Sequence, residues 1–246
     1  MSQTVATNVL NPSGGFPLVL TCEHASREIP PEYNNLGLSE GAIQRHIGWD
    51  IGAYAVTSEI TGLLDCTSIY SLYSRLLIDC NRDLEDHDLI VPRSDGTYIP
   101  GNSKLKNSDI TKRIKSFYEP FHSAVDNTLA NREDPPNCLI SIHSFTPILA
   151  GKERPFDLGI LFDTQEDLAK ELGEKLSRKN LRIRYNEPYS GKNGLIFSAR
   201  RHGKKYSLAY LEIEINNGIL LHMSGIKITA AKIAAVLKEM FDGRGD

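Results

Sequence analysis

The chain has 246 residues, with 28 Lys and Arg against 31 Asp and Glu, and 40% of its residues are hydrophobic. A chain of this length buries about 70% of the surface that its unfolded form exposes, so it folds without a disulfide or metal staple. The formal charge of −3 suits neither a nucleic-acid binder nor an acidic solvating tail. The mixed composition also excludes a collagen-like, coiled-coil or disordered chain.

Three features bear on the cellular compartment. No apolar run is long enough to span a bilayer, and residues 1–15 lack the basic start and apolar centre of a secretory signal. The cysteines stand in apolar runs without a CxxC pair, which indicates buried, reduced thiols: Cys22, Cys66, Cys80 and Cys138. We therefore expect a cytoplasmic protein with neither a membrane nor a nucleic-acid partner. The sequence gives no indication of its oligomeric state.

Strand-like and helix-like patterns alternate along the chain. In the first half, the patterns predict strands at about 17–22, 67–72 and 76–80, and helices at about 39–60 and 108–129. Residues 81–106 show no periodicity, and a loop of this length either closes over a site or forms a surface excursion. In the second half, the patterns predict strands at about 138–142, 157–162, 181–185 and 207–215, and helices at about 164–176 and 226–241.

This alternation predicts one α/β domain over residues 1–246, with a core at about 16–241. Its central sheet should be mostly parallel or mixed and flanked by helices. In such a sheet the active site lies beyond the carboxyl ends of the strands.

Polar side chains mark three of the expected strand ends. Glu23 and His24 follow the first strand, and His143 follows the first strand of the second half. Glu212 and Glu214 are two residues apart, so they project from one face of their strand. A lone histidine at a strand end is usually an ordinary polar residue, and paired carboxylates are usually solvated. Together, however, two imidazoles and two carboxylates can supply a catalytic zinc site with a proton acceptor beside it.

Arginines cluster around two further motifs. Arg75 and Arg82, with Asn81, can hold a substrate carboxylate, because a guanidinium matches a carboxylate at two points. The alternative for Arg82 is a structural ion pair with Asp79. Arg201 and His202 can contact substrate or polarise a carbonyl, and the alternative for His202 is an exposed loop imidazole. The remaining histidines have no such surroundings and are interpreted as structural or exposed: His87, His122 and His222.

The chain resembles the N-formylglutamate amidohydrolase family from about residue 16 to residue 240. The most specific segment of the resemblance is an Arg-x-x-x-Asp-x-Asn-Arg run that begins at Arg75. The segments that carry the resemblance are Cys22-Glu-His-Ala-Ser26 with Pro30, His46-Ile-Gly-Trp-Asp-Ile-Gly-Ala53, Ser74-Arg-Leu-Leu-Ile-Asp-Cys-Asn-Arg82, Ile142-His-Ser144, Arg201-His-Gly203 and Leu211-Glu-Ile-Glu-Ile-Asn216.

The resemblance implies a zinc-dependent amidohydrolase with an α/β fold related to that of zinc carboxypeptidases. It places His24 and His143 at the zinc-binding histidines and Asp50 at the acidic ligand, although Glu23 and His46 are close enough to compete. It also aligns Glu214 with the catalytic glutamate, because the following Ile-Asn-Asn fits the family pattern better than the residues after Glu212.

The function expected from the sequence is hydrolysis of the amide bond of an N-acyl amino acid such as N-formylglutamate. Glu214 would accept the proton of water, Arg82 and His202 would assist at the reacting carbonyl, and the substrate carboxylate would meet Arg75, Asn81, Arg82 or Arg201. One alternative is a related zinc hydrolase that cleaves N-acetyl amino acids or a cell-wall amide. Another is a module of the same fold that binds a small acid without catalysis.

Overall fold

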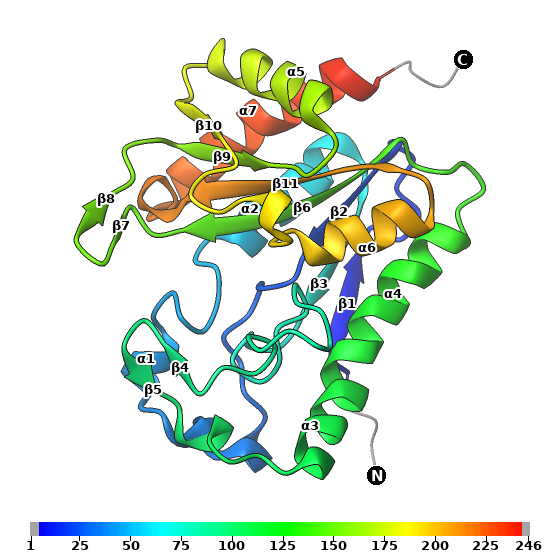
Figure 1. Cartoon of the computed structure of the whole chain (residues 1–246). Coiled ribbons are helices and arrows are strands. Elements are labelled where there is room, and N and C mark those ends of the chain that lie inside the picture. Colours follow the sequence, from blue (N-terminus) through cyan, green and yellow to red (C-terminus); the bar gives the residue numbers. More distant parts are fainter. Residues whose placement is uncertain (1–4, 243–246) are drawn as a thin grey trace.

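The computed structural model describes residues 5–242, and a seven-stranded sheet forms its centre (Figure 1). The strands stand in the order β1-β3-β2-β6-β11-β9-β10. Their bounds are β1 Thr7–Leu10, β2 Leu18–Cys22, β3 Thr67–Ser71, β6 Cys138–Phe145, β9 Leu158–Leu161, β10 Ile183–Tyr185 and β11 Ala209–Asn216. Two hairpins lie outside this sheet: β4 Arg93–Ser94 with β5 Thr97–Tyr98, and β7 Ile148–Leu149 with β8 Lys152–Glu153.

The sheet is mixed, with a parallel centre. β3, β2, β6 and β11 run parallel, whereas β1 is antiparallel to β3 and β9 is antiparallel to β11. All eight residues of β6 are buried, as expected for the middle strand of a sheet that is covered on both faces. The expected fold class, an α/β domain with a mixed central sheet flanked by helices, is confirmed.

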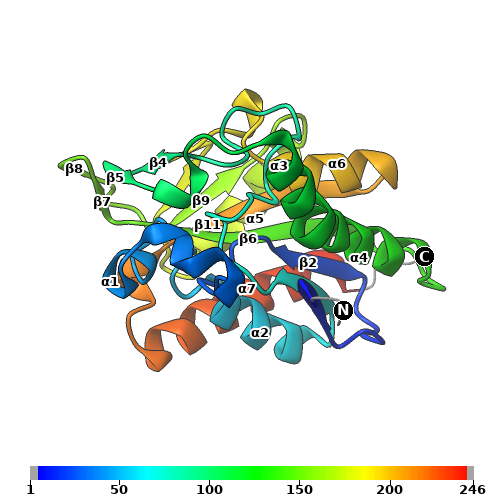
Figure 2. The ribbon, with the colours of Figure 1, turned by 90° about the horizontal axis from the view of Figure 1, so that it is seen from below.

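Helices cover both faces of the sheet (Figure 2). One face packs against α2 (Ala53–Leu64), α5 (Glu166–Ser177) and α7 (Met223–Phe241), and the other against α4 (Glu119–Ala130) and α6 (Phe197–Lys205). Successive strand residues alternate between the two cores, as the pleat requires: Leu18 and Leu20 join the first, and Val19 joins the second. The smaller helices are α1 (Glu40–Ile43) and α3 (Asn107–Arg113).

Within residues 5–242, no helix combines the length and the apolar composition that crossing a bilayer requires. The four cysteines are buried and free, as the apolar runs around them indicated.

The helix expected at 39–60 is wrong in its middle. The structure has the short α1, then turns, and α2 begins only at Ala53. Two glycines explain the break. Gly48 lies so close to the Ile43 carbonyl that a Cβ would come within 2.6 Å of its oxygen, and Gly52 has a φ of +84°. The break places Asp50 beside the end of β2, where its N–H donates to the His24 carbonyl over 3.0 Å.

The strand expected at 76–80 is also absent, since this segment turns instead of extending. The N–H of Leu77 donates to the Ser74 carbonyl, and the N–H of Asp79 donates to the Leu89 carbonyl. The long segment that follows is anchored at Asn102, whose amide donates to the carbonyls of Leu76 and Val91 at 2.8 Å each. These hydrogen bonds of Asn102 hold the C-terminal part of residues 81–106 against residues 76 and 91.

Several elements of the described residues were not expected from the sequence, among them β1, the hairpins β4–β5 and β7–β8, and α6. The sequence of α6, Phe-Ser-Ala-Arg-Arg-His-Gly-Lys-Lys, has little apolar periodicity, so its burial depends on the polar contacts described below. The helix expected at 108–129 is present but begins at Asn107 and passes through a π-helical turn, Ile114–Tyr118, before α4.

Candidate active site

A cavity of about 480 Å³ opens at the carboxyl ends of β2, β6 and β11. The strand ends supply His24, His143, Glu212 and Glu214, and the turn before α2 supplies Asp50. The segment after β3 closes another side of the cavity with Arg75, Asp79, Asn81, Arg82 and Arg93. The site therefore lies where a doubly wound sheet places its ligands, beyond the carboxyl ends of its central strands.

His24, Asp50 and His143 form a compact buried group, with side chains that each offer one ligand atom within 4.8 Å of the others. His143 Nδ1 lies 2.8 Å from Asp50 Oδ2, and His24 Nδ1 lies 3.4 Å from the same oxygen. His24 Nδ1 is buried and has no hydrogen-bond partner. Two imidazole nitrogens and a carboxylate oxygen thus converge on one point.

The opposite nitrogens of both histidines face other carboxylates. His24 Nε2 lies 2.6 Å from Asp79 Oδ1, and His143 Nε2 lies 3.0 Å from Glu23 Oε2. These carboxylates can accept the Nε2 proton, which would leave each Nδ1 free to bind a cation placed beside Asp50. Without a cation, His143 Nδ1 can donate to Asp50. Metal-binding histidines are typically oriented by a carboxylate in this way.

Charge also suits a cation, because five buried carboxyl groups converge here: Glu23, Asp50, Asp79, Glu212 and Glu214. Burial by itself would lower the pKa of His143, but Glu212, Asp50 and Glu23 hold it well above its ordinary value. Burial would raise the pKa of Asp50, yet His24 and His143 outweigh it and hold that pKa below the ordinary range. Both shifts favour the charged forms, and the raised pKa of His143 reflects the excess of carboxylates around it. A divalent cation would neutralise this negative charge.

Of the residues that compete with Asp50, neither Glu23 nor His46 faces the point where the two Nδ1 atoms converge. Glu23 lies on the Nε2 side of His143 and accepts a 2.5 Å hydrogen bond from Ser141. His46 Nε2 is 3.6 Å from Asp95 Oδ2 at the rim of the cavity. Asp50, and neither Glu23 nor His46, is therefore the acidic residue grouped with the two Nδ1 atoms.

Glu212 and Glu214 differ in their partners. Glu212 Oε2 accepts a 2.9 Å hydrogen bond from the Asn81 amide and lies 3.5 Å from His143 Nε2. Glu214 pairs in register with His143 across β11 and β6, and its Oε2 is buried without a hydrogen-bond partner. Burial raises the pKa of Glu212 to about 7 and that of Glu214 well above its ordinary value. Glu214 is therefore the carboxylate with a free oxygen at the cavity.

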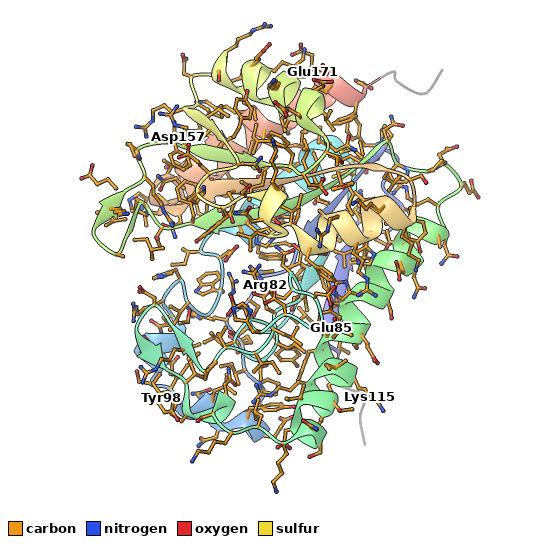
Figure 3. All side chains as sticks on the ribbon, in the orientation of Figure 1. Arg82, Glu85, Tyr98, Lys115, Asp157 and Glu171 are labelled. Carbon is orange, nitrogen blue, oxygen red and sulfur yellow. The ribbon has the colours of Figure 1, made fainter. Side chains whose placement is uncertain are left out.

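The two arginines of the Arg-x-x-x-Asp-x-Asn-Arg run have different surroundings. Arg75 Nη2 donates to Asp79 over 2.7 Å, and Nη1 lies 3.6 Å from Asp50, so Arg75 is the partner of Asp79. Arg82 has no carboxylate within ion-pair distance among residues 5–242, and the alternative of an Asp79–Arg82 pair is not found. Figure 3 shows Arg82 near the centre of the molecule, and its side chain lines the cavity.

Arg201 and His202 do not line the cavity. Arg201 Nη1 donates to Tyr118 Oη over 3.4 Å, and His202 is fully buried between α6 and α4. The alternative of an exposed loop imidazole is therefore wrong as well. Among the other histidines, His87 is exposed and His122 is buried against His202.

Comparisons with known proteins agree with this architecture. The family model described as N-formylglutamate amidohydrolase matches residues 16–221. The chain belongs to the N-formylglutamate amidohydrolase family. The resemblance inferred from the sequence is thus confirmed, and family membership supports a hydrolase of amide bonds.

Two solved structures are similar to nearly the whole chain of this N-formylglutamate amidohydrolase family member. The gene product Atu2144 from Agrobacterium tumefaciens is 31% identical, with a TM-score of 0.91 over 97% of each chain. The N-formylglutamate amidohydrolase from Ralstonia eutropha JMP134 is 17% identical, with a TM-score of 0.71 over 97% of each chain. A comparison with curated proteins gives no significant match.

The sequence does not indicate the place of two side chains of the site. Asp79 is predicted only as a partner of Arg82, whereas it contacts His24. Tyr189 lines the cavity from the segment after β10 and is not predicted. The signal for Asp79 is its place inside the most specific family motif, but nothing in the local sequence marks Tyr189.

Proposed function

We propose that this protein is a zinc-dependent amidohydrolase that cleaves the amide bond of an N-acyl, and specifically an N-formyl, amino acid. The observation that carries the proposal is the arrangement of His24 and His143. Both direct Nδ1 toward Asp50, while Asp79 and Glu23 hold their Nε2 atoms. The name of the Ralstonia eutropha structure supports the choice of substrate class.

The residues present fit a zinc ion, because two imidazoles and one carboxylate are a frequent protein donor set for catalytic zinc. His24, Asp50 and His143 would hold it. A bound zinc ion would explain why the buried Nδ1 of His24 has no hydrogen-bond partner. When bound, zinc supplies Lewis-acid activation of water and of the scissile carbonyl.

Glu214 would transfer the proton. Its free carboxylate oxygen would accept a proton from the attacking water, and the same proton would pass to the departing amine nitrogen as the C–N bond breaks. The raised pKa of Glu214 would be lowered by a cation held by His24, Asp50 and His143, so that the Glu214 carboxylate could accept the proton and then give it back. The products are a carboxylic acid and an amino acid.

Arg82 would bind the substrate carboxylate. Its guanidinium faces the cavity region without a carboxylate of its own, whereas Arg75 is already paired with Asp79 and Asp50. A planar guanidinium contacts a carboxylate at two points and so fixes the orientation of the bound acid. A cavity of about 480 Å³ suits a small acylated amino acid.

The test is a hydrolysis screen over N-formyl and N-acetyl amino acids with zinc added, together with elemental analysis of protein purified without chelator. We expect about one zinc per chain and turnover of an N-formyl substrate with an acidic side chain. His143→Ala should lose both the metal and the activity, while Asp95→Asn, at the cavity rim, should retain both. Protein that takes up no transition metal would refute the zinc site. Stoichiometric zinc without hydrolysis of any substrate would favour the non-catalytic module.

A further inference from the structure

The Arg201-His202-Gly203 motif has no place in the mechanism above, yet its histidine is fully buried. His202 lies on α6, between that helix and α4. Its Nδ1 lies 2.9 Å from Asp126 Oδ1, and its Nε2 lies 2.8 Å from His122 Nδ1. Both partners belong to α4. A single imidazole thus joins two helices through both of its nitrogens.

One assignment of protons satisfies both contacts of His202. Its Nδ1–H donates to the Asp126 carboxylate, and its Nε2 then accepts from the Nδ1–H of His122. Burial lowers the pKa of both histidines, so the neutral forms that this pattern requires are the favoured ones. The arrangement is directional, because exchanging the donor and acceptor nitrogens would place two lone pairs or two protons in opposition.

The neighbours of His202 fix the same helix. Arg201 reaches Tyr118 Oη, and that hydroxyl donates to the Arg82 carbonyl over 2.9 Å. Gly203 packs against the ring of Tyr210 on β11 so closely that a Cβ has no room. All three residues of the motif therefore determine where α6 lies relative to α4 and the sheet.

The first turn of α6 has no capping side chain of its own; residue 81, far away in sequence, supplies the cap. The Ser198 N–H donates to Asn81 Oδ1 over 2.9 Å. The Asn81 amide nitrogen donates in turn to Glu212 Oε2 over 2.9 Å, beside His143. Because the amide is planar, accepting from α6 with its oxygen directs its N–H₂ toward Glu212. The position of α6 therefore sets the orientation of a polar group inside the cavity.

We infer that His202 is a positioning residue for the active site. Through its contacts with Asp126 and His122, it holds α6 so that the Ser198 N–H orients Asn81, and Asn81 in turn holds Glu212 beside His143. This inference rests on the proposed function for its consequence in turnover, but its structural part does not need a bound metal.

The primary experiment is amide hydrogen exchange at Ser198 in the metal-free protein. In Asp126→Ala, which changes only the α4 side, we expect exchange at Ser198 to accelerate on the order of 10-fold. His202→Ala should do the same, and His202→Asn, whose amide can still donate to Asp126, should recover part of the protection. The matched control is Lys205→Ala, because this exposed cation contacts the same carboxylate over 2.8 Å from the solvent side. In Lys205→Ala, the exchange rate of the Ser198 amide should match that of the unaltered protein.

The second measurement is a double-mutant cycle on turnover with His202→Ala and Asn81→Ala. If His202 acts through Asn81, each single substitution lowers kcat by roughly 10-fold with little change in KM, and the double variant is no slower than the worse single one. Additive losses would mean that the two residues act independently. Unchanged Ser198 exchange in both Asp126→Ala and His202→Ala would overturn the inference, even if the melting temperature fell. If the unaltered protein hydrolyses nothing, the proposed function fails, while the exchange data still decide the role of His202.

Discussion

His24 and Asp79 are joined by a 2.6 Å contact between Nε2 and Oδ1, and neither residue is more than 4% exposed. The other partners of Asp79 lie in its own segment of the chain. Its Oδ1 also accepts from the Asn81 N–H, and its Oδ2 accepts from Arg75. Asp79 thus connects the end of β2 to the segment that carries Arg75 and Arg82. The same carboxylate fixes the tautomer of His24 and the course of that segment.

Asp79→Asn should therefore weaken metal binding without removing a ligand. The amide cannot accept the Nε2 proton as a carboxylate does, so His24 becomes a poorer and less well oriented ligand. We expect the zinc dissociation constant to rise roughly 10- to 100-fold. Competition with a chromophoric chelator measures this constant. Asp95→Asn is the control, since Asp95 lines the same cavity but contacts Arg45 and His46. Equal affinity in the two variants would show that Asp79 does not support the metal site.

Arg82→Lys should raise KM by more than the retained charge suggests, because an ammonium cannot make a planar two-point contact. We expect an increase of about 10-fold, which corresponds to the loss of one charge-assisted hydrogen bond. The melting temperature should change little, since Arg82 forms no ion pair in residues 5–242. A large fall in melting temperature with an unaltered KM would instead assign Arg82 a structural role.

The sequence predicted the edge of the sheet at which the histidines lie, because each follows a buried apolar run. His24 follows the end of β2, whereas β6 continues past His143 to Phe145, and adjacent parallel strands bring their carboxyl ends to one edge. Asp50 required the family resemblance, since its place depends on the break at Gly48 and Gly52, which apolar periodicity alone does not show.

Other parts of the site depend on tertiary contacts that no local pattern reveals. The helix α6 is short and basic, and it is held by His202 and by a cap from Asn81, 117 residues away in sequence. Likewise, Arg113 donates to the carbonyls of Leu77 and Gly101 and so stabilises a segment that resembles a free loop in the sequence. Apolar periodicity predicts only helices and strands that have an apolar face. These two segments are instead held in place by hydrogen bonds of polar side chains.

The stability of the metal-free protein should depend on the protonation of His122. Burial, and then His202 and Arg201, lower the pKa of this histidine well below its ordinary value of 6.5, despite Glu23 and Asp126. A lowered pKa means that the unfolded chain binds the proton more readily. The stabilising contribution is therefore present above about pH 6.5 and is lost as the pH falls.

The comparison of the unaltered protein with His122→Asn isolates this effect. The asparagine keeps a donor near Nδ1 for His202 but cannot titrate. The difference in unfolding free energy between the two proteins should shrink by about 1 kcal/mol between roughly pH 7.5 and pH 5.5. Urea denaturation at each pH measures it. A difference that stays constant or grows toward acid would mean that His122 is not held neutral.

The last prediction separates Glu214 from Glu212, which project from the same face of β11. Glu214→Gln keeps the size of the side chain but removes the free basic oxygen, so kcat should fall by roughly 10²- to 10⁴-fold with zinc content unchanged. Glu212→Gln should act differently, because Glu212 already accepts from Asn81 and lies beside His143. We expect a smaller loss of kcat in that variant.

Steady-state kinetics and elemental analysis of both variants distinguish the two glutamates. If the larger loss follows Glu212, the proton acceptor lies two residues earlier on β11 and the chemistry is otherwise unchanged. If neither substitution slows turnover, water is activated by a group outside this strand.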